Sequence, residues 1–146
     1  MRVTIGADHR GWELKGRIAR LLERLGHDVE DVGTDSAESA DYPDYALAVA
    51  RRTAAEPANR GLLICSNGVG MCMTANKVKG VRAALCVNMA MALQSRRHND
   101  ANVLCLGADN QPPEEALAMV EAWLGEPFEG GRHARRVRKI AQAESP

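Results

Sequence analysis

Short apolar segments alternate along this chain with longer segments in which apolar residues recur every three or four positions. The short segments are typical of strands that are buried on both faces of a sheet. They lie at Val3–Ala7, His27–Val32, Leu62–Cys65, Val81–Val87 and Asn102–Leu106. The pattern therefore predicts five strands.

The longer segments predict amphipathic helices. In the first of them, Leu14, Ile18 and Leu22 share one helical face, and Gly26 favours a helix end. Pro43 comes just before the second helix, where proline suits a helix start. The predicted helices span Trp12–Leu25, Tyr45–Ala55, Met71–Val78, Ala90–Arg97, Pro113–Leu124 and, as a basic C-terminal helix, about Arg132–Ala143.

This alternation predicts an α/β fold with a parallel sheet, because parallel strands are joined by helical crossovers that cover both faces. We expect a single domain over residues 1–146, with a three-layer, Rossmann-like, doubly wound fold around a five-stranded parallel sheet. Such folds bind their ligands at the carboxyl ends of the strands. Polar and reactive residues follow several predicted strands, among them Asp8-His9 after the first and Cys65-Ser66-Asn67-Gly68 after the third.

The charge balance argues against a nucleic acid or membrane partner. Lys plus Arg and Asp plus Glu number 19 each, and aromatic residues make up 3% of the chain, so neither a basic field nor a set of stacking platforms is present. The N-terminus enters an apolar strand directly, without the pattern of a signal or transit peptide, and no apolar run has the length of a membrane span. We therefore expect a cytoplasmic protein.

The cysteines do not predict a metal site. They stand at positions 65, 72, 86 and 105 without CxxC spacing, and the histidines lack zinc-site spacing. In a reducing compartment we expect free thiols that mostly pack as small apolar residues.

The segment from Cys65 to Gly70 is the most informative one. Its glycines, Gly68 and Gly70, let the backbone before a helix turn several N–H groups toward one point, where an anionic oxygen is stabilised. A cysteine at the mouth of such a loop favours its thiolate form. The segment is neither a P-loop nor a full dinucleotide fingerprint. From this pattern alone, a tight strand–helix turn with a buried cysteine is an equally good interpretation.

Three other groups could carry chemistry, and each also has a structural interpretation. Asp8-His9 pairs a carboxylate with an imidazole, which can bind sugar hydroxyls and exchange protons, but Asp8 also suits a helix N-cap. His98 can act as acid or base near neutral pH, or be a solvated loop residue. Arg132 and Arg136 share a helix face and fit a phosphate dianion, or belong to a solvated basic helix.

The order and spacing of these groups resemble one family. The motifs that carry the resemblance are Gly6-Ala7-Asp8-His9-Arg10-Gly11, Asp41-Tyr42-Pro43-Asp44-Tyr45-Ala46, Cys65–Gly70, Ser95-Arg96-Arg97-His98-Asn99-Asp100 and Phe128-Glu129-Gly130-Gly131-Arg132-His133. Over nearly its whole length the chain resembles the type B ribose-5-phosphate isomerases and their sugar-phosphate isomerase relatives, which include galactose-6-phosphate isomerase.

The resemblance implies interconversion of ribose 5-phosphate and ribulose 5-phosphate without a metal or other cofactor. It also implies a homodimer, paired in some members into a tetramer, whose active sites take residues from both chains. Part of the family uses a cysteine as the base, which Cys65 matches. Another branch uses a glutamate six residues further on, where this chain has Met71. The base is therefore expected to be Cys65.

The resemblance also implies roles for the other candidates. His98, helped by Asp8, would open the furanose ring, and the amides of the loop after Cys65 would stabilise an enediolate. Asn99 and Tyr42 would hold sugar hydroxyls. The residues expected to bind the substrate are His9, Tyr42, Ser66, Asn67, Gly68, Val69, Gly70, Asn99, Arg132 and Arg136, of which His9 and the two arginines would hold the phosphate.

Two departures from the family leave the substrate open. Asn67 replaces a hydroxyl residue of many relatives and Asp109 replaces an arginine, so the phosphate site loses one cation or is built differently. The alternatives are an isomerase of a six-carbon sugar phosphate such as allose or galactose 6-phosphate, a non-catalytic sugar-phosphate-binding subunit, and a nucleotide-binding module. Intact Cys65, Asp8 and His98 argue against the second, and the missing glycine fingerprint argues against the third.

Overall fold

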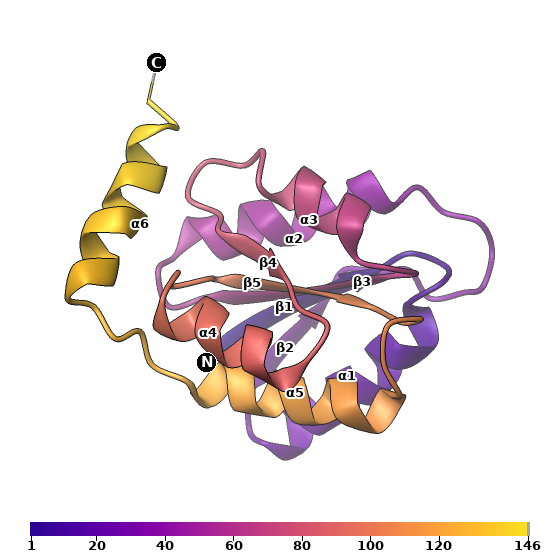
Figure 1. The fold of residues 1–146 in the computed structure, drawn as a ribbon. Coiled ribbons are helices and arrows are strands. Elements are labelled where there is room, and N and C mark those ends of the chain that lie inside the picture. Colours follow the sequence, from indigo (N-terminus) through magenta and orange to yellow (C-terminus); the bar gives the residue numbers. More distant parts are fainter. Residues whose placement is uncertain (146) are drawn as a thin grey trace.

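Five parallel strands form one sheet, in the order β2-β1-β3-β5-β4, in the computed structural model, which describes residues 1–145 (Figure 1). The strands are β1 (Arg2–Ala7), β2 (Asp28–Asp31), β3 (Arg60–Cys65), β4 (Ala83–Leu85) and β5 (Val103–Gly107). The helices are α1 (Trp12–Arg24), α2 (Tyr42–Ala55), α3 (Val69–Ala75), α4 (Met89–Arg97), α5 (Pro113–Gly125) and α6 (Arg132–Gln142). The predicted five-stranded, doubly wound α/β fold is confirmed.

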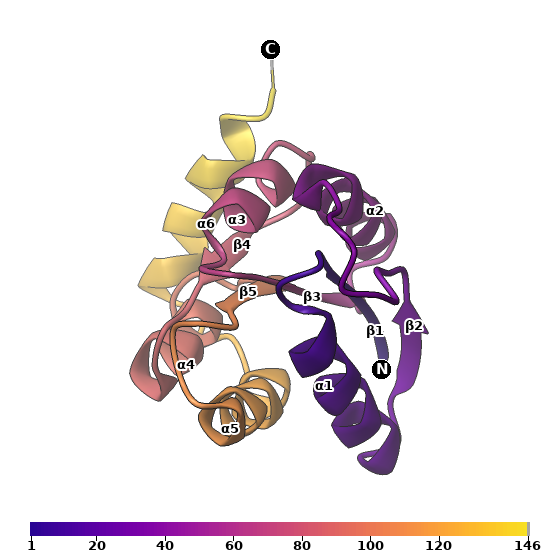
Figure 2. The same cartoon turned by 90° about the vertical axis from the view of Figure 1, so that its right-hand side faces the viewer.

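Helices cover both faces of the sheet, α2 and α3 on one face and α1, α4 and α5 on the other (Figure 2). Side chains alternate between the faces along each strand. In β3, Leu62 and Ile64 pack in the core below α1 and α5, whereas Leu63 and Cys65 pack in the core below α2 and α3. The strand is therefore apolar at each position from Leu62 to Cys65.

Among the predicted boundaries that differ from the structure, two have clear local reasons. The fourth strand covers only Ala83–Leu85, because it is an edge strand paired with β5 alone and because Asn88 already caps α4 by accepting a hydrogen bond from the Met91 N–H at 2.9 Å. The second helix begins at Tyr42, three residues before the predicted start, so that Pro43 lies in its first turn.

The C-terminal helix α6 stands apart from the three layers. No residue of α6 is buried, and both views show it beside the edge formed by β4 and α3. Just after the helix, the Glu144 carboxylate accepts a hydrogen bond from the Gly80 N–H at 2.9 Å. An isolated helix of this length is marginal in water, so α6 lacks most of the packing that stabilises helices in globular proteins.

No helix within residues 1–145 combines the length and the apolar character that crossing a bilayer requires.

We predict that Leu104→Ala, at a fully buried position of β5, lowers the free energy of unfolding by about 2–5 kcal/mol, because it leaves a cavity between the sheet and α5. Leu25→Ala, at a position that is 42% exposed, is the matched control and should cost less than about 1 kcal/mol. Urea denaturation of both variants measures the difference. Equal midpoints would contradict the assignment of Leu104 to the core.

Candidate active site

The carboxyl ends of β1, β3 and β5 lie side by side at one edge of the sheet. In the register of β3, Ile64 lies opposite Ala7 of β1, and Cys65 lies opposite Gly107 of β5. Asp8 follows β1 directly, and its N–H donates to the Ile64 carbonyl at 3.3 Å. Asp8 and Cys65 therefore lie on neighbouring strands at the same edge, as the sequence predicts.

The loop after β3 turns around the sulfur of Cys65. The Gly68 N–H donates to the Cys65 Sγ at 3.1 Å, and Cys65 is only 5% exposed. Gly68 has a φ of +82°, and a Cβ there would lie 2.5 Å from a leucine methyl of β4, so the turn requires glycine. The Val69 N–H donates to the Asn67 side-chain oxygen at 3.0 Å. These two amides have acceptors within the loop, whereas that of Gly70 lies in the first turn of α3, where no intrahelical acceptor exists.

Asp8 is buried and does not cap the helix that follows it. Its Oδ1 accepts a hydrogen bond from the Arg10 N–H at 2.9 Å. The N-cap of α1 is Gly11, which makes no side-chain capping bond. This position requires glycine, because a Cβ at Gly11 would lie 2.5 Å from the Ile64 carbonyl oxygen. The alternative that Asp8 is an N-cap residue is therefore wrong.

His9, in the turn after β1, and Tyr42, at the start of α2, lie beside this edge. The His9 Nδ1 accepts a hydrogen bond from the Ala40 N–H at 3.1 Å, so a neutral His9 carries its proton on Nε2 and can donate it. The Tyr42 ring covers Gly70, where a Cβ would lie 2.8 Å from the Tyr42 hydroxyl oxygen. Both predicted binding residues are thus near the Cys65 loop.

Asp109, one of the departures from the family pattern, is part of the same edge. Its N–H donates to the carbonyl of half-buried Ser66 at 2.9 Å. Its carboxylate forms an ion pair with the Arg10 guanidinium at 3.1 Å. The negative charge at position 109 is therefore matched by a cation from the loop after β1.

The remaining predicted residues form a second group around the end of α4. His98 is the C-cap of α4, and its ring stacks on that of His133 with centroids 4.3 Å apart and planes at 11°. The His98 Nε2 lies 3.6 Å from a Glu129 carboxylate oxygen. Asn99 is exposed beside it, and Arg132 and Arg136 are exposed on α6.

A metal ion is usually held by at least three His, Cys, Asp or Glu side chains. Among residues 1–145, the only such group whose ligand atoms come within 4.8 Å of one another is His98, Glu129 and His133. An imidazole binds a metal ion in the plane of its ring. The rings of His98 and His133 are nearly parallel, with centroids 4.3 Å apart, so no nearby point lies in the planes of both rings. The arrangement is a stack, and it would have to be rebuilt before both histidines could hold one ion at the usual distance of about 2.0–2.1 Å.

One chain does not bring the two groups together. Cys65 lies at the carboxyl edge of the sheet, whereas His98 ends a helix that runs back to the amino edge, shortly before β5 begins at Val103. β5 is five residues long, so the two edges are about 13 Å apart at the rise of a parallel strand. Within one chain, His98 therefore lies at the edge of the sheet opposite to Asp8.

Cys72 is a perturbed thiol that the sequence did not single out. It is half-buried in α3, and a hydrogen bond with Cys105 lowers the pKa of the Cys72 thiol to about 7. The hydrogen bond and burial both raise the pKa of Cys105 well above its ordinary value, and burial raises the pKa of Cys86 to about 11. The thiols at positions 86 and 105 are thus inert core residues, as expected, whereas Cys72 is partly ionised at neutral pH.

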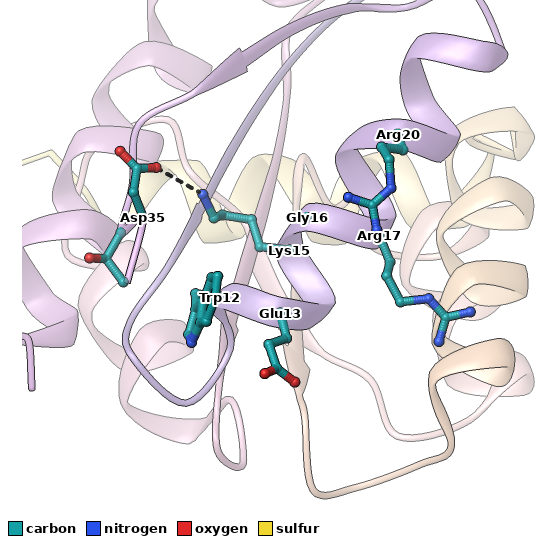
Figure 3. Close-up of a pocket in the computed structure, with 8 residues that line it drawn as sticks. Trp12, Glu13, Lys15, Gly16, Arg17, Arg20 and Asp35 are labelled. Atoms are coloured by element: carbon teal, nitrogen blue, oxygen red, sulfur yellow. Dashed lines mark ion pairs between the residues drawn. The ribbon is translucent and has the colours of Figure 1, made fainter. Parts of the chain in front are cut away.

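A hollow of about 430 Å³ on the outer flank of α1 lies apart from both groups (Figure 3). Lys15, which is almost fully buried, approaches Asp35 at 3.7 Å there and binds the Asp31 carboxylate at 2.6 Å. Asp31 also accepts the Gly33 N–H at 2.9 Å, and the Gly33 carbonyl accepts the Ala7 N–H at 2.6 Å. The Lys15 ion pair thus anchors the turn that lies beside the end of β1, immediately before Asp8.

Comparison with known proteins agrees with the motifs in the sequence. The model of the family described as Ribose/Galactose Isomerase matches residues 3–140. Ribose-5-phosphate isomerase B of Escherichia coli (strain K12) is 44% identical over 143 residues, which cover 98% of this chain and 96% of that protein.

Solved structures are similar over the whole fold. Ribose-5-phosphate isomerase B of Clostridium thermocellum has a TM-score of 0.94 at 47% identity and covers 99% of this chain and 97% of its own. The enzyme of Mycoplasma genitalium, solved with bound ribulose 5-phosphate, has a TM-score of 0.95 at 42% identity and covers 98% of this chain and 95% of its own. The resemblance expected from the sequence is thereby confirmed.

We predict that Cys72 reacts with iodoacetamide at neutral pH much faster than Cys86 or Cys105. Only a thiolate reacts, and the thiolate fraction of Cys72 rises as pH passes through its pKa of about 7, whereas the pKa of Cys86 is about 11. Peptide mapping by mass spectrometry between pH 6 and pH 9 gives the rate at each site. A Cys72 rate that still rises tenfold per pH unit above pH 8 would contradict the lowered pKa.

Proposed function

This chain is an isomerase of the ribose/galactose isomerase family, and we propose that it interconverts ribose 5-phosphate and ribulose 5-phosphate with Cys65 as the base. The observation that carries the proposal is the Gly68 N–H donated to the Cys65 sulfur at 3.1 Å, one strand away from the buried Asp8 carboxylate. Relatives that are 42–47% identical carry the name ribose-5-phosphate isomerase B, and one of them binds ribulose 5-phosphate.

The proposed reaction moves one proton between adjacent carbons of the open-chain sugar. The Cys65 thiolate takes the proton from C2, the C–H electrons form the C1–C2 double bond, and the aldehyde oxygen becomes the enediolate oxygen. A proton then passes from the C2 hydroxyl to O1, and the Cys65 thiol returns its proton to C1. The product is the ketose, and the thiolate is regenerated.

The environment of Cys65 supports this role. The N–H of Gly68 donates to the sulfur at 3.1 Å, and a hydrogen bond is stronger when its acceptor carries a charge. Of the four amides from Asn67 to Gly70, those of Gly68 and Val69 already donate within the loop, which leaves the amides of Asn67 and Gly70 to stabilise the enediolate oxygen. Met71, where another branch of the family has a glutamate, is fully buried in the core under α2 and α3 and carries no proton to exchange.

Ring opening and phosphate binding are proposed to use a second copy of the chain. His98, together with Asp8, would move the proton between the anomeric hydroxyl and the ring oxygen, and Asn99 would hold a sugar hydroxyl. Arg132 and Arg136 carry two cations on the same helix. With the Nε2–H of His9 they form a set of donors suited to a phosphate dianion.

The surface supports such an assembly. Large apolar side chains that are 37–64% exposed occur on α3, at the start of α4, in the turn between β4 and α4, and on α6. They are Val69, Met73, Val87, Met89, Met91 and Ile140. A second copy that covers these side chains would also supply α6 with the packing that it lacks within one chain. We therefore propose a homodimer, or a tetramer built from dimers, with two shared sites per dimer.

We predict that Cys65→Ala lowers kcat by about 10²–10⁴-fold, the usual contribution of a general base, while binding of ribose 5-phosphate changes little. Proton NMR in D2O would follow both ribulose 5-phosphate formation and exchange at C2. Cys86→Ala, which removes an equally buried thiol on the other face of the sheet, is the control and should keep its activity. Undiminished C2 exchange in Cys65→Ala would move the base to another residue.

A second prediction tests the sharing of the site. Cys65→Ala and His98→Asn should each be inactive alone, but a mixed dimer of the two variants should recover up to half of the wild-type kcat per dimer, because one of its two sites then has both residues intact. Co-expression with two different affinity tags isolates the mixed dimer. A mixed dimer as inactive as its parents would place both residues of a site in the same chain.

A further inference from the structure

We propose that Arg10 binds the substrate phosphate, with its guanidinium positioned by Asp109. The inference rests on the proposed function, because it takes a sugar phosphate as the substrate. It assigns a further binding residue to the carboxyl edge of the sheet, and a positioning residue behind it.

Arg10 is fixed at both ends. Its backbone N–H donates to the Asp8 carboxylate at 2.9 Å, so that the residue cannot move independently of Asp8. Its Nη2 donates to the Asp109 carboxylate at 3.1 Å, which draws the guanidinium from the loop after β1 toward the turn after β5. The side chain therefore extends across the end of β3, the strand that lies between β1 and β5.

Asp109 is itself held to the loop that carries the base. Its N–H donates to the Ser66 carbonyl at 2.9 Å, and the preceding Ala108 N–H donates to the Cys65 carbonyl at 2.8 Å. The Asn110 side chain adds a hydrogen bond to the Asn67 carbonyl at 2.9 Å. The position of the Arg10 guanidinium is thus tied to the backbone of residues 65–67.

The exposure of the pair favours a binding role over a role in stability. The side chains of Arg10 and Asp109 are 57% and 60% exposed, and ion pairs this open to water contribute little to folding. A guanidinium has five N–H donors, and among residues 1–145 that of Arg10 uses only Nη2. The other donors face solvent at the rim of the site, where a phosphate dianion can accept two of them.

The ion pair also determines which charge remains in the Arg10→Ala variant. Without the guanidinium, the Asp109 carboxylate becomes an unpaired anion at the rim and repels the phosphate. The affinity for phosphate therefore falls in Arg10→Ala for two reasons: the attraction of the guanidinium is removed, and the repulsion from the Asp109 carboxylate is no longer neutralised. The repulsion disappears when Asp109 is neutralised as well.

The test compares Arg10→Ala with Arg2→Ala in the full chain. Arg2 pairs with Asp28 at 2.9 Å with side chains that are 54% and 65% exposed, but it stands at the amino end of β1. In Arg10→Ala we expect the KM for ribose 5-phosphate and the inhibition constant for inorganic phosphate to rise about tenfold, the value of one exposed charged hydrogen bond, at unchanged kcat. Arg2→Ala should change neither constant, and Arg10→Lys should fall in between because it keeps the charge but loses the fork.

Two variants test the role of Asp109. The single variant Asp109→Asn keeps Arg10 but no longer positions it, so the inhibition constant for inorganic phosphate should rise although a repelling charge has been removed. The double variant Arg10→Ala, Asp109→Asn should recover part of the affinity lost in Arg10→Ala, because the carboxylate that repels the phosphate is gone. Equal phosphate inhibition constants in Arg10→Ala and Arg2→Ala would overturn the role of Arg10. An unchanged or lower constant in Asp109→Asn would overturn the positioning role of Asp109, and no recovery in the double variant would overturn the repulsion.

Failure of the proposed function is recognised separately. If the wild-type chain does not convert ribose 5-phosphate, the proposed function falls, and calorimetric titration with inorganic phosphate then decides the role of Arg10 by itself. Tenfold weaker phosphate binding in Arg10→Ala than in Arg2→Ala supports the assignment, and equal binding in the two variants refutes it.

Discussion

The pairing of β3 with β1 on one side and β5 on the other is the constraint on which the candidate site depends. Because Ile64 lies opposite Ala7 and Cys65 lies opposite Gly107, three loops leave the sheet at the same level. The hydrogen bonds from the Asp8 and Ala108 amides to β3 continue this register past the ends of the strands. The Cys65 thiol, the Asp109 carboxylate and the Arg10 guanidinium, which are far apart in the sequence, are thereby held close to one another.

The same parallel geometry divides the chemistry between two edges. A helix that follows a strand of a parallel sheet returns to the amino edge, so His98 at the end of α4 and Cys65 at the end of β3 face opposite ends of the molecule. One chain therefore holds the two halves of the proposed site. One half has the Cys65 thiol under a structured loop, and the other has His98 at the end of α4, stacked on His133 of the arginine-bearing helix α6. Two antiparallel copies would bring unlike halves together twice.

Much of the fold and the thiol half of the site could be predicted from the sequence, because both follow from local patterns. Apolar runs gave the strands, and the rule for strand ends placed Asp8 with Cys65. The separation of His98 from Cys65 also follows from the sequence, since His98 precedes a predicted strand whereas Cys65 ends one. The family resemblance indicates the roles of the two residues but not the edges of the sheet at which they lie.

What the sequence could not show depends on strand order and on packing. The contact between Arg10 and Asp109 requires β1 and β5 to flank β3, which no local pattern reveals. The interaction with Cys105 that lowers the pKa of Cys72 likewise joins a helix to a strand distant in sequence. The N-cap interpretation of Asp8 was wrong because the N-cap of α1 lies three residues later, at Gly11, where only a glycine can lie this close to the Ile64 carbonyl.

The peripheral position of α6 has a consequence for how such a chain tolerates damage. Since none of its residues is buried and Gly130-Gly131 precede it, a protease that cuts at this glycine pair would remove four arginines, Arg132 and Arg136 among them, and His133, and leave the three layers intact. The trimmed product would keep its spectroscopic signature of folding. In the proposed site, however, the phosphate opposite Cys65 would lose both arginines, so that folding and the proposed substrate binding could be lost separately.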